Sequence, residues 1–168
     1  MLVFVIWLTG LPCSGKSTIA KELTKHISNL AILDGDEIRQ WFSVTDFSKN
    51  GIIENNKRIA HIAKLLSIHN VPVCVSLVSP YHKNREDARK IINNKFIEVY
   101  LKCPQNVCEK RDTKGMYKKA RTGLVKNFLG LDNRYQIPKK PEIVVDTEKL
   151  SLKESVRIIL DHVKNVNK

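Results

Sequence analysis

One eight-residue segment constrains this chain more than any other feature: residues 10–17 are Gly-Leu-Pro-Cys-Ser-Gly-Lys-Ser. Two glycines separated by four residues and followed by Lys and Ser form a known phosphate-binding pattern. An apolar, β-rich run at 2–8 precedes the segment, and residues 17–28 follow it with apolar side chains at helical spacing. A strand, a glycine-rich turn and a helix in this order let backbone N–H groups surround phosphate oxygens. The segment therefore predicts nucleotide binding.

The side chains of this loop have expected tasks. Lys16 is expected to contact the β and γ phosphates of ATP, which also makes it a predicted catalytic residue, and Ser17 is expected to ligate Mg²⁺ through its hydroxyl. The residues predicted to bind ATP here are Gly10, Cys13, Ser14, Gly15, Lys16, Ser17 and Thr18.

Strands and helices are predicted to alternate along the rest of the chain. Apolar runs predict strands at 30–33, 71–78, 96–101 and 142–146, and helical periodicity occurs at 55–69, 85–93, 104–120 and 152–163. This alternation predicts an α/β, three-layer P-loop NTPase fold around a mainly parallel sheet. Residues 1–168 are expected to form a single domain.

Residues from about 111 to 141 are predicted to form a basic lid. Their first part is helical and rich in Lys and Arg, whereas Gly130, Pro138 and Pro141 interrupt any regular element in the second part. A mobile basic segment of this kind is suited to cover a polyphosphate.

Composition and net charge indicate which ligands this chain is expected to bind and in which cellular compartment it is expected to work. The chain has 29 Lys and Arg against 17 Asp and Glu, a net charge of +12, which favours anionic ligands. The basic residues are dispersed rather than gathered in a stripe with aromatics, so polyphosphate ligands are expected and nucleic acid is not. The four cysteines lack zinc-site spacing, and no apolar stretch approaches the roughly 20 residues that span a bilayer. A cytoplasmic protein without membrane partners is the expectation.

Two acids follow the predicted strand at 30–33. Asp34 and Asp36 flank a glycine at a strand's carboxyl end, where open α/β sheets bind ligands. A hydroxyl nucleophile needs a carboxylate to orient it and accept its proton, so Asp36 is the predicted base and shares the Mg²⁺. The alternative is an Asp-Gly turn that caps the next helix.

Further segments extend the phosphate loop into a family pattern. They are residues 33–39, 47–48, 54–55, 79–81, 114–121 and 126–130. Together with 10–17 they resemble the adenylyl-sulfate kinases over nearly the whole chain. The resemblance implies a kinase that uses ATP and Mg²⁺ to phosphorylate the ribose 3′-hydroxyl of adenosine 5′-phosphosulfate. Many members of the family are dimers, so a homodimer is one expectation.

The resemblance also assigns roles to residues. It places Asp36 beside the 3′-hydroxyl, and Arg39 on the anionic group of the acceptor. Phe47 and Phe128 would stack on the acceptor base. Further acceptor contacts are implied for Asp34, Asn55, Arg58 and Lys126, and cover over ATP is implied for Arg111, Lys118, Lys119 and Arg121.

Ser79 matches a serine that is often described in the family as a phosphorylated intermediate, which makes it a candidate catalytic residue. In-line transfer needs no covalent step, so a structural role for its hydroxyl is an equal alternative.

The chain departs from the family pattern at Gly51 and Ile52, where the family has an Asp-Arg pair whose Arg holds the phosphosulfate. Loss of a charged hydrogen-bond pair costs about 1.5–3 kcal/mol. Either Lys57 or Arg58 compensates, or the acceptor is different. The leading different acceptor is cytidine diphosphoramidate, which a relative of the family phosphorylates for capsule decoration. A non-catalytic ATP-binding module is a third possibility.

Overall fold

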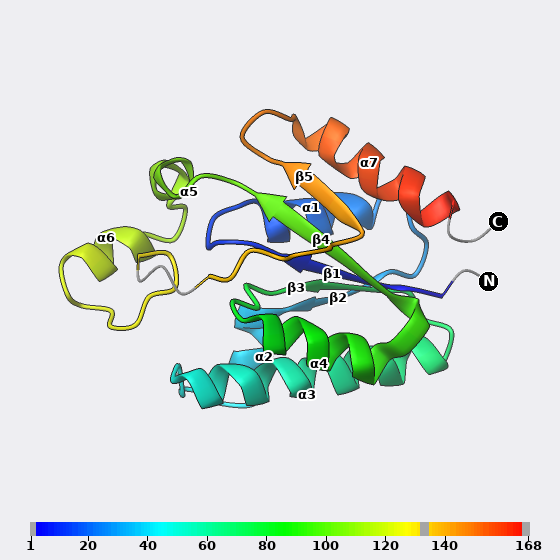
Figure 1. The fold of residues 1–168 in the computed structure, drawn as a ribbon, viewed down its shortest axis with the longest axis horizontal. Coiled ribbons are helices and arrows are strands. Elements are labelled where there is room, and N and C mark those ends of the chain that lie inside the picture. Colours follow the sequence, from blue (N-terminus) through cyan, green and yellow to red (C-terminus); the bar gives the residue numbers. More distant parts are fainter. Residues whose placement is uncertain (1–2, 132–134, 166–168) are drawn as a thin grey trace.

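The computed structural model describes residues 3–131 and 135–165, and a five-stranded sheet lies at its centre (Figure 1). The strand order is β2-β3-β1-β4-β5, and each pair of neighbours is parallel. The strands are β1 Val5–Thr9, β2 Ala31–Asp34, β3 Val73–Ser76, β4 Phe96–Lys102 and β5 Ile143–Asp146. The predicted α/β fold with a parallel sheet is confirmed.

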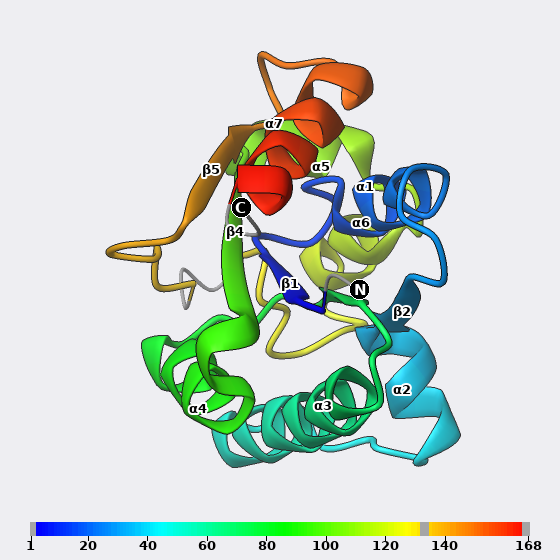
Figure 2. The same cartoon turned by 90° about the vertical axis from the view of Figure 1, so that its right-hand side faces the viewer.

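Helices cover both faces of this sheet (Figure 2). Helices α1 Lys16–Leu23 and α7 Leu152–Asn165 lie on one face, and α3 Lys49–Ile68 and α4 His82–Ile92 lie on the other. Because side chains of a strand alternate between faces, Ile6 and Leu8 enter the first of these cores and Val5 and Trp7 enter the second. The central strand is therefore buried on both sides, as its continuous apolar sequence predicts.

Several helix boundaries differ from the prediction, most of all those of α3 and α1. The helix predicted from residue 55 is α3, and it begins at Lys49 because the side chain of Ser48 accepts a hydrogen bond from the N–H of Gly51, 3.1 Å away. Helix α1 ends at Leu23 rather than at residue 28.

A short helix was missed after β2. Helix α2, Gly35–Trp41, begins directly after the strand, and the carboxylate of Asp34 accepts a hydrogen bond from the N–H of Asp36 at 3.0 Å. The capping role considered for this Asp-Gly segment is therefore present.

The predicted lid projects from the carboxyl-terminal end of the sheet (Figure 1). Its basic helical part consists of two helices, α5 Gln105–Arg111 and α6 Met116–Arg121, rather than one. The carboxylate of Asp112 accepts hydrogen bonds from the N–H groups of Tyr117 and Lys118, both at 3.1 Å, and so ends one helix and caps the other. Within 122–131 and 135–141 there is no helix or strand, as predicted; residues 132–134 of the predicted lid lie outside the described residues.

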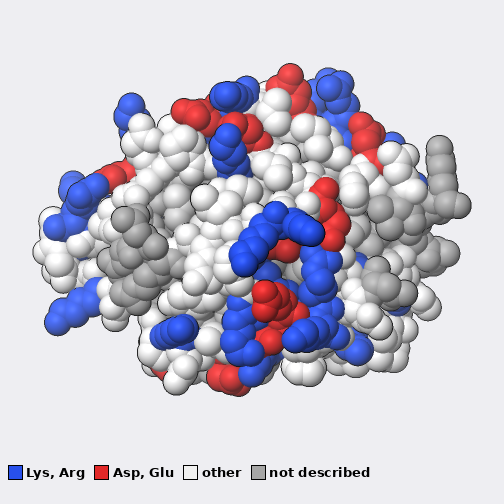
Figure 3. Space-filling model, viewed as in Figure 1, with Lys and Arg blue, Asp and Glu red and all other residues white. Residues whose placement is uncertain are grey.

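The charged surface is mixed rather than uniformly basic. On the face shown in Figure 3, Lys and Arg side chains intermingle with Asp and Glu. Ion pairs around α4 include Lys83 with Asp87 at 3.1 Å and Arg89 with Glu142 at 2.7 Å. This face offers no single-sign stripe of the kind that tracks a nucleic-acid backbone. None of the helices in the described part of the chain has the length and apolar character to cross a membrane.

Candidate active site

The loop between β1 and α1 lies where the sequence predicted it. Gly15 directly precedes α1 with a φ of 100°, a left-handed conformation that glycine adopts without strain. Ser14 is buried, and its carbonyl accepts a 2.9 Å hydrogen bond from the hydroxyl of Thr147, which ties the loop to the end of β5. Cys13 is half-buried, and Thr18 is exposed in the first turn of α1. The N–H groups at the start of α1 are the donors that a phosphate would use.

Lys16 folds back over this loop. Its ammonium donates to the carbonyls of Gly10 and Leu11, at 3.0 and 2.7 Å, and the side chain is buried. Burial lowers the pKa of Lys16 to about 8, with the charges of nearby groups opposing that shift only in part. A desolvated ammonium held by neutral carbonyls gains a large stabilisation when anionic oxygens arrive.

Ser17 faces the end of β2. Its hydroxyl donates to Oδ2 of Asp34 at 2.7 Å and lies 3.2 Å from the hydroxyl of Ser76 at the end of β3. Hydroxyl and carboxylate oxygens are the donors that Mg²⁺ prefers. The predicted metal pair was Ser17 with Asp36, whereas the structure brings Ser17 to Asp34.

Asp36 is the second residue of α2, and its carboxylate points toward the lid. Its carboxylate is exposed, and Oδ2 accepts a 2.5 Å hydrogen bond from the ammonium of Lys114 in the turn between α5 and α6. The sequence placed Asp36 at this sheet edge, but not beside this lid lysine.

Two guanidinium groups lie on exposed aromatic rings near α2 and the start of α3. Arg39 is 4.4 Å above the ring of Phe47, and Arg58 is 5.5 Å above the ring of Phe42. Arg58 also donates to Oδ1 of Asn55 at 3.3 Å. Burial, reinforced by the charge of Arg58, lowers the pKa of Arg39, while the carboxylates of Asp36 and Asp46 oppose the shift. Among the described residues, neither guanidinium has a carboxylate within 4.0 Å.

Aromatic packing attaches the lid to the phosphate loop. Tyr117 of α6 is fully buried, and its hydroxyl donates to the carbonyl of Pro12 at 3.2 Å. Phe128 packs edge-on against this ring with the centroids 4.9 Å apart. Phe128 is therefore part of the lid's own core here, while its predicted stacking partner Phe47 lies exposed under Arg39.

The lid cations predicted to cover ATP have different partners. Arg111 donates to the carbonyl of Thr147 at 2.6 Å, which places it beside the phosphate loop. Arg121 instead forms a two-bonded ion pair with Glu109 of α5, at 2.8 and 2.9 Å. Lys118 and Lys119 are exposed and have no carboxylate within ion-pair distance in the described part of the chain. The same holds for Lys126, which was predicted to contact the acceptor instead.

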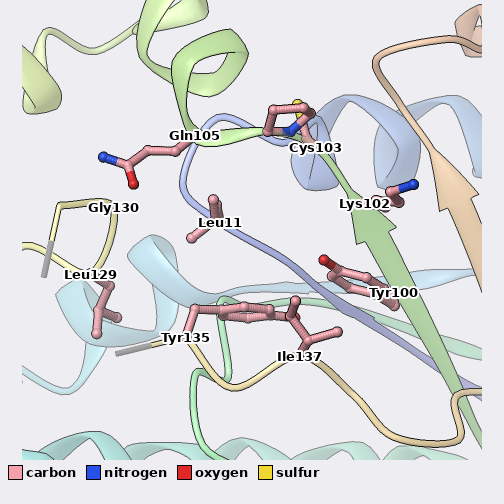
Figure 4. Close-up of a pocket in the computed structure, with 10 residues that line it drawn as sticks. Leu11, Tyr100, Lys102, Cys103, Gln105, Leu129, Gly130, Tyr135 and Ile137 are labelled. Carbon is pink, nitrogen blue, oxygen red and sulfur yellow. The ribbon is translucent and has the colours of Figure 1, made fainter. Parts of the chain in front are cut away.

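A cavity of about 300 Å³ lies between the lid and β4 (Figure 4). Leu129 and Ile137 line it from the lid side, and Leu11 and Tyr100 line it from the loop and the strand. The Tyr100 and Tyr135 rings stack with their centroids 6.0 Å apart. None of the acids discussed above lines this cavity, so it is separate from the site formed by Lys16, Asp34 and Asp36.

Comparison with known proteins identifies the family. The family model described as adenylylsulphate kinase matches residues 2–146. The chain belongs to this family. The adenylyl-sulfate kinase of Clostridium acetobutylicum is 42% identical over 165 residues, which cover 95% of this chain and 82% of that protein. The adenylyl-sulfate kinase of Clostridium kluyveri is 43% identical over 162 residues, which cover 94% of this chain and 81% of that protein.

A solved structure of an adenylyl-sulfate kinase is also similar. The enzyme from Mycobacterium tuberculosis in complex with AMPPNP and APS matches with a TM-score of 0.89 at 36% identity, covering 96% of this chain and 98% of that chain. Similarity at this level over the full sheet and lid supports transferring the family's fold to this chain.

Within this adenylyl-sulfate kinase fold, Ser79 is enclosed in a polar network. It is 1% exposed, accepts a 2.9 Å hydrogen bond from the indole of Trp7 and donates to Oδ1 of Asn56 at 2.7 Å. These two partners use the proton of the hydroxyl and one of its lone pairs. This geometry favours the structural role over the phosphorylated intermediate.

The structure shows what surrounds Gly51 and Ile52, the two positions at which the chain departs from the family pattern. Ile52 is 2% exposed, so the chain has a buried apolar side chain where the family has its arginine. A Cβ on Gly51 would lie 2.4 Å from the carboxylate of Asp46, which itself caps the start of α3 through Ser48. Lys57 pairs with Glu54 at 3.2 Å and is committed elsewhere. Arg58 is the remaining candidate for compensation.

Proposed function

We propose that this chain is an adenylyl-sulfate kinase that transfers the γ-phosphoryl group of ATP to the ribose 3′-hydroxyl of adenylyl sulfate. The observation that carries the proposal is the convergence of Lys16, Asp34 and Asp36 at the carboxyl ends of β1 and β2, next to two guanidinium groups without carboxylate partners. The family membership and the names of the relatives support the same reaction.

On the donor side, the phosphates of ATP would replace the carbonyls of Gly10 and Leu11 as the hydrogen-bond partners of Lys16. The ammonium lies 3.0 and 2.7 Å from those oxygens in the free protein, and it would exchange them for the β and γ phosphate oxygens when ATP binds. The electrostatic stabilisation is greatest in the transition state, where a preorganised cation stabilises the charge that develops on the transferring phosphoryl group. Arg111, fixed by Thr147, would approach ATP from the base of the lid.

Mg²⁺ fits the oxygen donors at this end of the sheet. Ser17 would hold it directly and Asp34 through water, since these two side chains are 2.7 Å apart. When bound, the ion supplies charge neutralisation between the β and γ phosphates. In the described residues no group of three or more His, Cys, Asp or Glu could hold a metal, and this suits an ion that keeps waters and phosphate oxygens as ligands.

Asp36 is the group that would act on the acceptor hydroxyl. Its exposed carboxylate can accept a hydrogen bond from the 3′-hydroxyl, orient that oxygen in line with the γ-phosphate and take its proton. Transfer then needs positioning and charge stabilisation only, and no protein nucleophile.

The acceptor would lie on the α2 and α3 side. Arg39 and Arg58 offer planar forks suited to its phosphosulfate oxygens. Asn55 is fully buried and its Nδ2 has no hydrogen-bond partner among the described residues, so this amide would donate to the acceptor once neighbouring side chains move aside. Stacking of the acceptor base between Phe47 and Phe128 requires Phe128 to leave its edge-on contact with Tyr117, which is a movement of the lid.

The cytidine diphosphoramidate alternative is not favoured. The curated relatives at about 42% identity are adenylyl-sulfate kinases, and Arg58 offers a guanidinium that can replace the missing one. The non-catalytic alternative loses support because Lys16, Ser17 and Asp36 are all present at the carboxyl ends of β1 and β2.

An acceptor panel tests the proposal. The protein is incubated with labelled ATP, Mg²⁺ and either adenylyl sulfate or cytidine diphosphoramidate, and transfer is expected to adenylyl sulfate. Lys16→Ala and Asp36→Ala are each expected to lower kcat by about two to three powers of ten in a folded protein. Transfer to the cytidine compound alone, or near-normal rates in both variants, would refute the assignment.

We also propose a cytoplasmic location and a homodimer. All four cysteines are free thiols, as a reducing compartment maintains them, and ATP is available there. The homodimer rests on the family resemblance, and sedimentation of the purified protein tests it. A monomeric mass at micromolar concentration would exclude it.

A further inference from the structure

The turn between α5 and α6 brings one lid lysine into the active site. The ammonium of Lys114 lies 2.5 Å from Oδ2 of Asp36, although the two residues are 78 positions apart in the chain. Arg121, the lid cation with a carboxylate partner of its own, pairs inside the lid with Glu109. Among the described residues of the lid, Lys114 is therefore the cation that pairs with the candidate base.

The place of this turn is fixed by the fold. Gly115 has a φ of 65°, which closes the turn, and the carboxylate of Asp112 caps α6 through the N–H groups of Tyr117 and Lys118. Tyr117 is fully buried and bonded to the carbonyl of Pro12 in the phosphate loop. The backbone that carries Lys114 is consequently anchored to the loop that carries Lys16.

The charges around Lys114 belong to the transfer site. Its hydrogen bond to Asp36 is the main cause that raises the pKa of Lys114, and the charges of Asp36 and Asp34 add to this effect while burial opposes it. The ammonium thus faces both acids at the end of β2. The charges of the same two acids also act on Lys16, so both lysines interact electrostatically with this pair of carboxylates.

We propose that Lys114 is a positioning residue for phosphoryl transfer, which acts through Asp36 by fixing the orientation of its carboxylate. The inference rests on the proposed function. Both side chains are more than half exposed, at 65% and 72%, so the pair adds little to folding stability. Its effect belongs to the closed complex, where bound substrates exclude water and a fixed ion pair becomes stronger.

Single variants separate positioning from binding. Lys114→Met is expected to lower kcat about tenfold and to leave the KM for ATP within about threefold. Lys114→Arg keeps the cation and is expected to retain at least about a third of the wild-type kcat. Lys110→Met removes an exposed lysine of α5 with no contact to the site, and its kinetics should match the wild type. An unchanged kcat in Lys114→Met overturns the inference.

A double-variant cycle decides whether Lys114 acts through Asp36. Asp36→Asn alone is expected to be impaired by about two powers of ten, and adding Lys114→Met should cost less than about twofold more. If the losses of kcat in the two single variants multiplied in the double variant, the inference would be overturned, because Lys114 would then act independently of Asp36, on the phosphates themselves. Wild-type activity in Asp36→Asn would instead remove the assigned base, and absence of transfer in the wild-type protein would remove the proposed function.

Discussion

The affinity of this protein for ATP is predicted to fall as the pH rises through 8. Lys16 is buried in the loop, and desolvation lowers its pKa to about 8 in the free protein. The phosphates of ATP require the charged ammonium. Since raising the pH above the pKa removes that proton before ATP arrives, binding at high pH must include the uptake of a proton.

The size of the effect follows from this pKa. Lys16 is about nine-tenths charged at pH 7 and about one-tenth charged at pH 9. If the lysine stays charged in the complex, affinity falls about tenfold between these values, equivalent to ~1.4 kcal/mol. Proton uptake per ATP bound rises to about one half at pH 8. The second ionisation of phosphate lies near pH 6 and contributes little in this range.

Calorimetric titration with ATP in buffers of different ionisation enthalpy measures both the affinity for ATP and the number of protons taken up on binding. Lys16→Arg is the matched control, because a guanidinium stays charged throughout and its affinity, although weaker, should not depend on pH between 7 and 9. If the wild-type protein bound ATP equally well at pH 7 and pH 9 and took up no proton, Lys16 would not lose its charge in this range, contrary to the prediction.

Three further substitutions test other parts of the structure. Ser79→Ala leaves the indole of Trp7 without its partner and should lower the free energy of unfolding by about 1–3 kcal/mol, while kcat stays within about fivefold. Thermal unfolding and steady-state rates check this, and complete loss of transfer in the folded variant would contradict it. Gly51→Ala places a Cβ 2.4 Å from the carboxylate of Asp46 and 2.7 Å from its carbonyl oxygen, so it should destabilise by about 1–3 kcal/mol in urea unfolding; an unchanged midpoint would show that the turn adapts. Tyr117→Phe removes the hydrogen bond to the phosphate loop, worth about 0.5–1.5 kcal/mol, and faster amide exchange in α6 than in the wild type is expected; identical exchange would argue against this anchor.

The fold was largely predictable because its signals are local. The apolar runs gave all five strands, and the phosphate loop located α1. Helix α3 was placed six residues late because its cap, Ser48, lies ahead of the apolar periodicity and carries no apolar signal itself. Helix α2 was missed because seven residues are too few to show a periodicity, although Asp34 followed by glycine and two acids is a capping sequence.

The site was predictable in its residues but not in its pairings. Lys16, Ser17, Asp34 and Asp36 lie together because the carboxyl ends of parallel strands share one edge of the sheet. Ser17 bonds to Asp34 rather than to Asp36. The reason is that α2 begins between the two acids and turns the carboxylate of Asp36 away from Ser17.

Long-range contacts of the lid escaped the sequence altogether. Lys114 was part of a basic motif but had no distinguishing position within it, and its contact with Asp36 depends on how α5 and α6 are joined. Arg121 was expected over ATP, whereas its bidentate pair with Glu109 arises from the packing of two short helices that the periodicity presented as one.

The position of the transferred phosphate on the product shows whether this protein phosphorylates the ribose 3′-hydroxyl. The product formed from ATP and adenylyl sulfate is isolated and examined by ³¹P NMR and mass spectrometry. We expect one added phosphate on the ribose 3′-oxygen, with the sulfate retained. A phosphate on any other oxygen, or no phosphorylated nucleotide from a folded protein supplied with Mg²⁺, would contradict it.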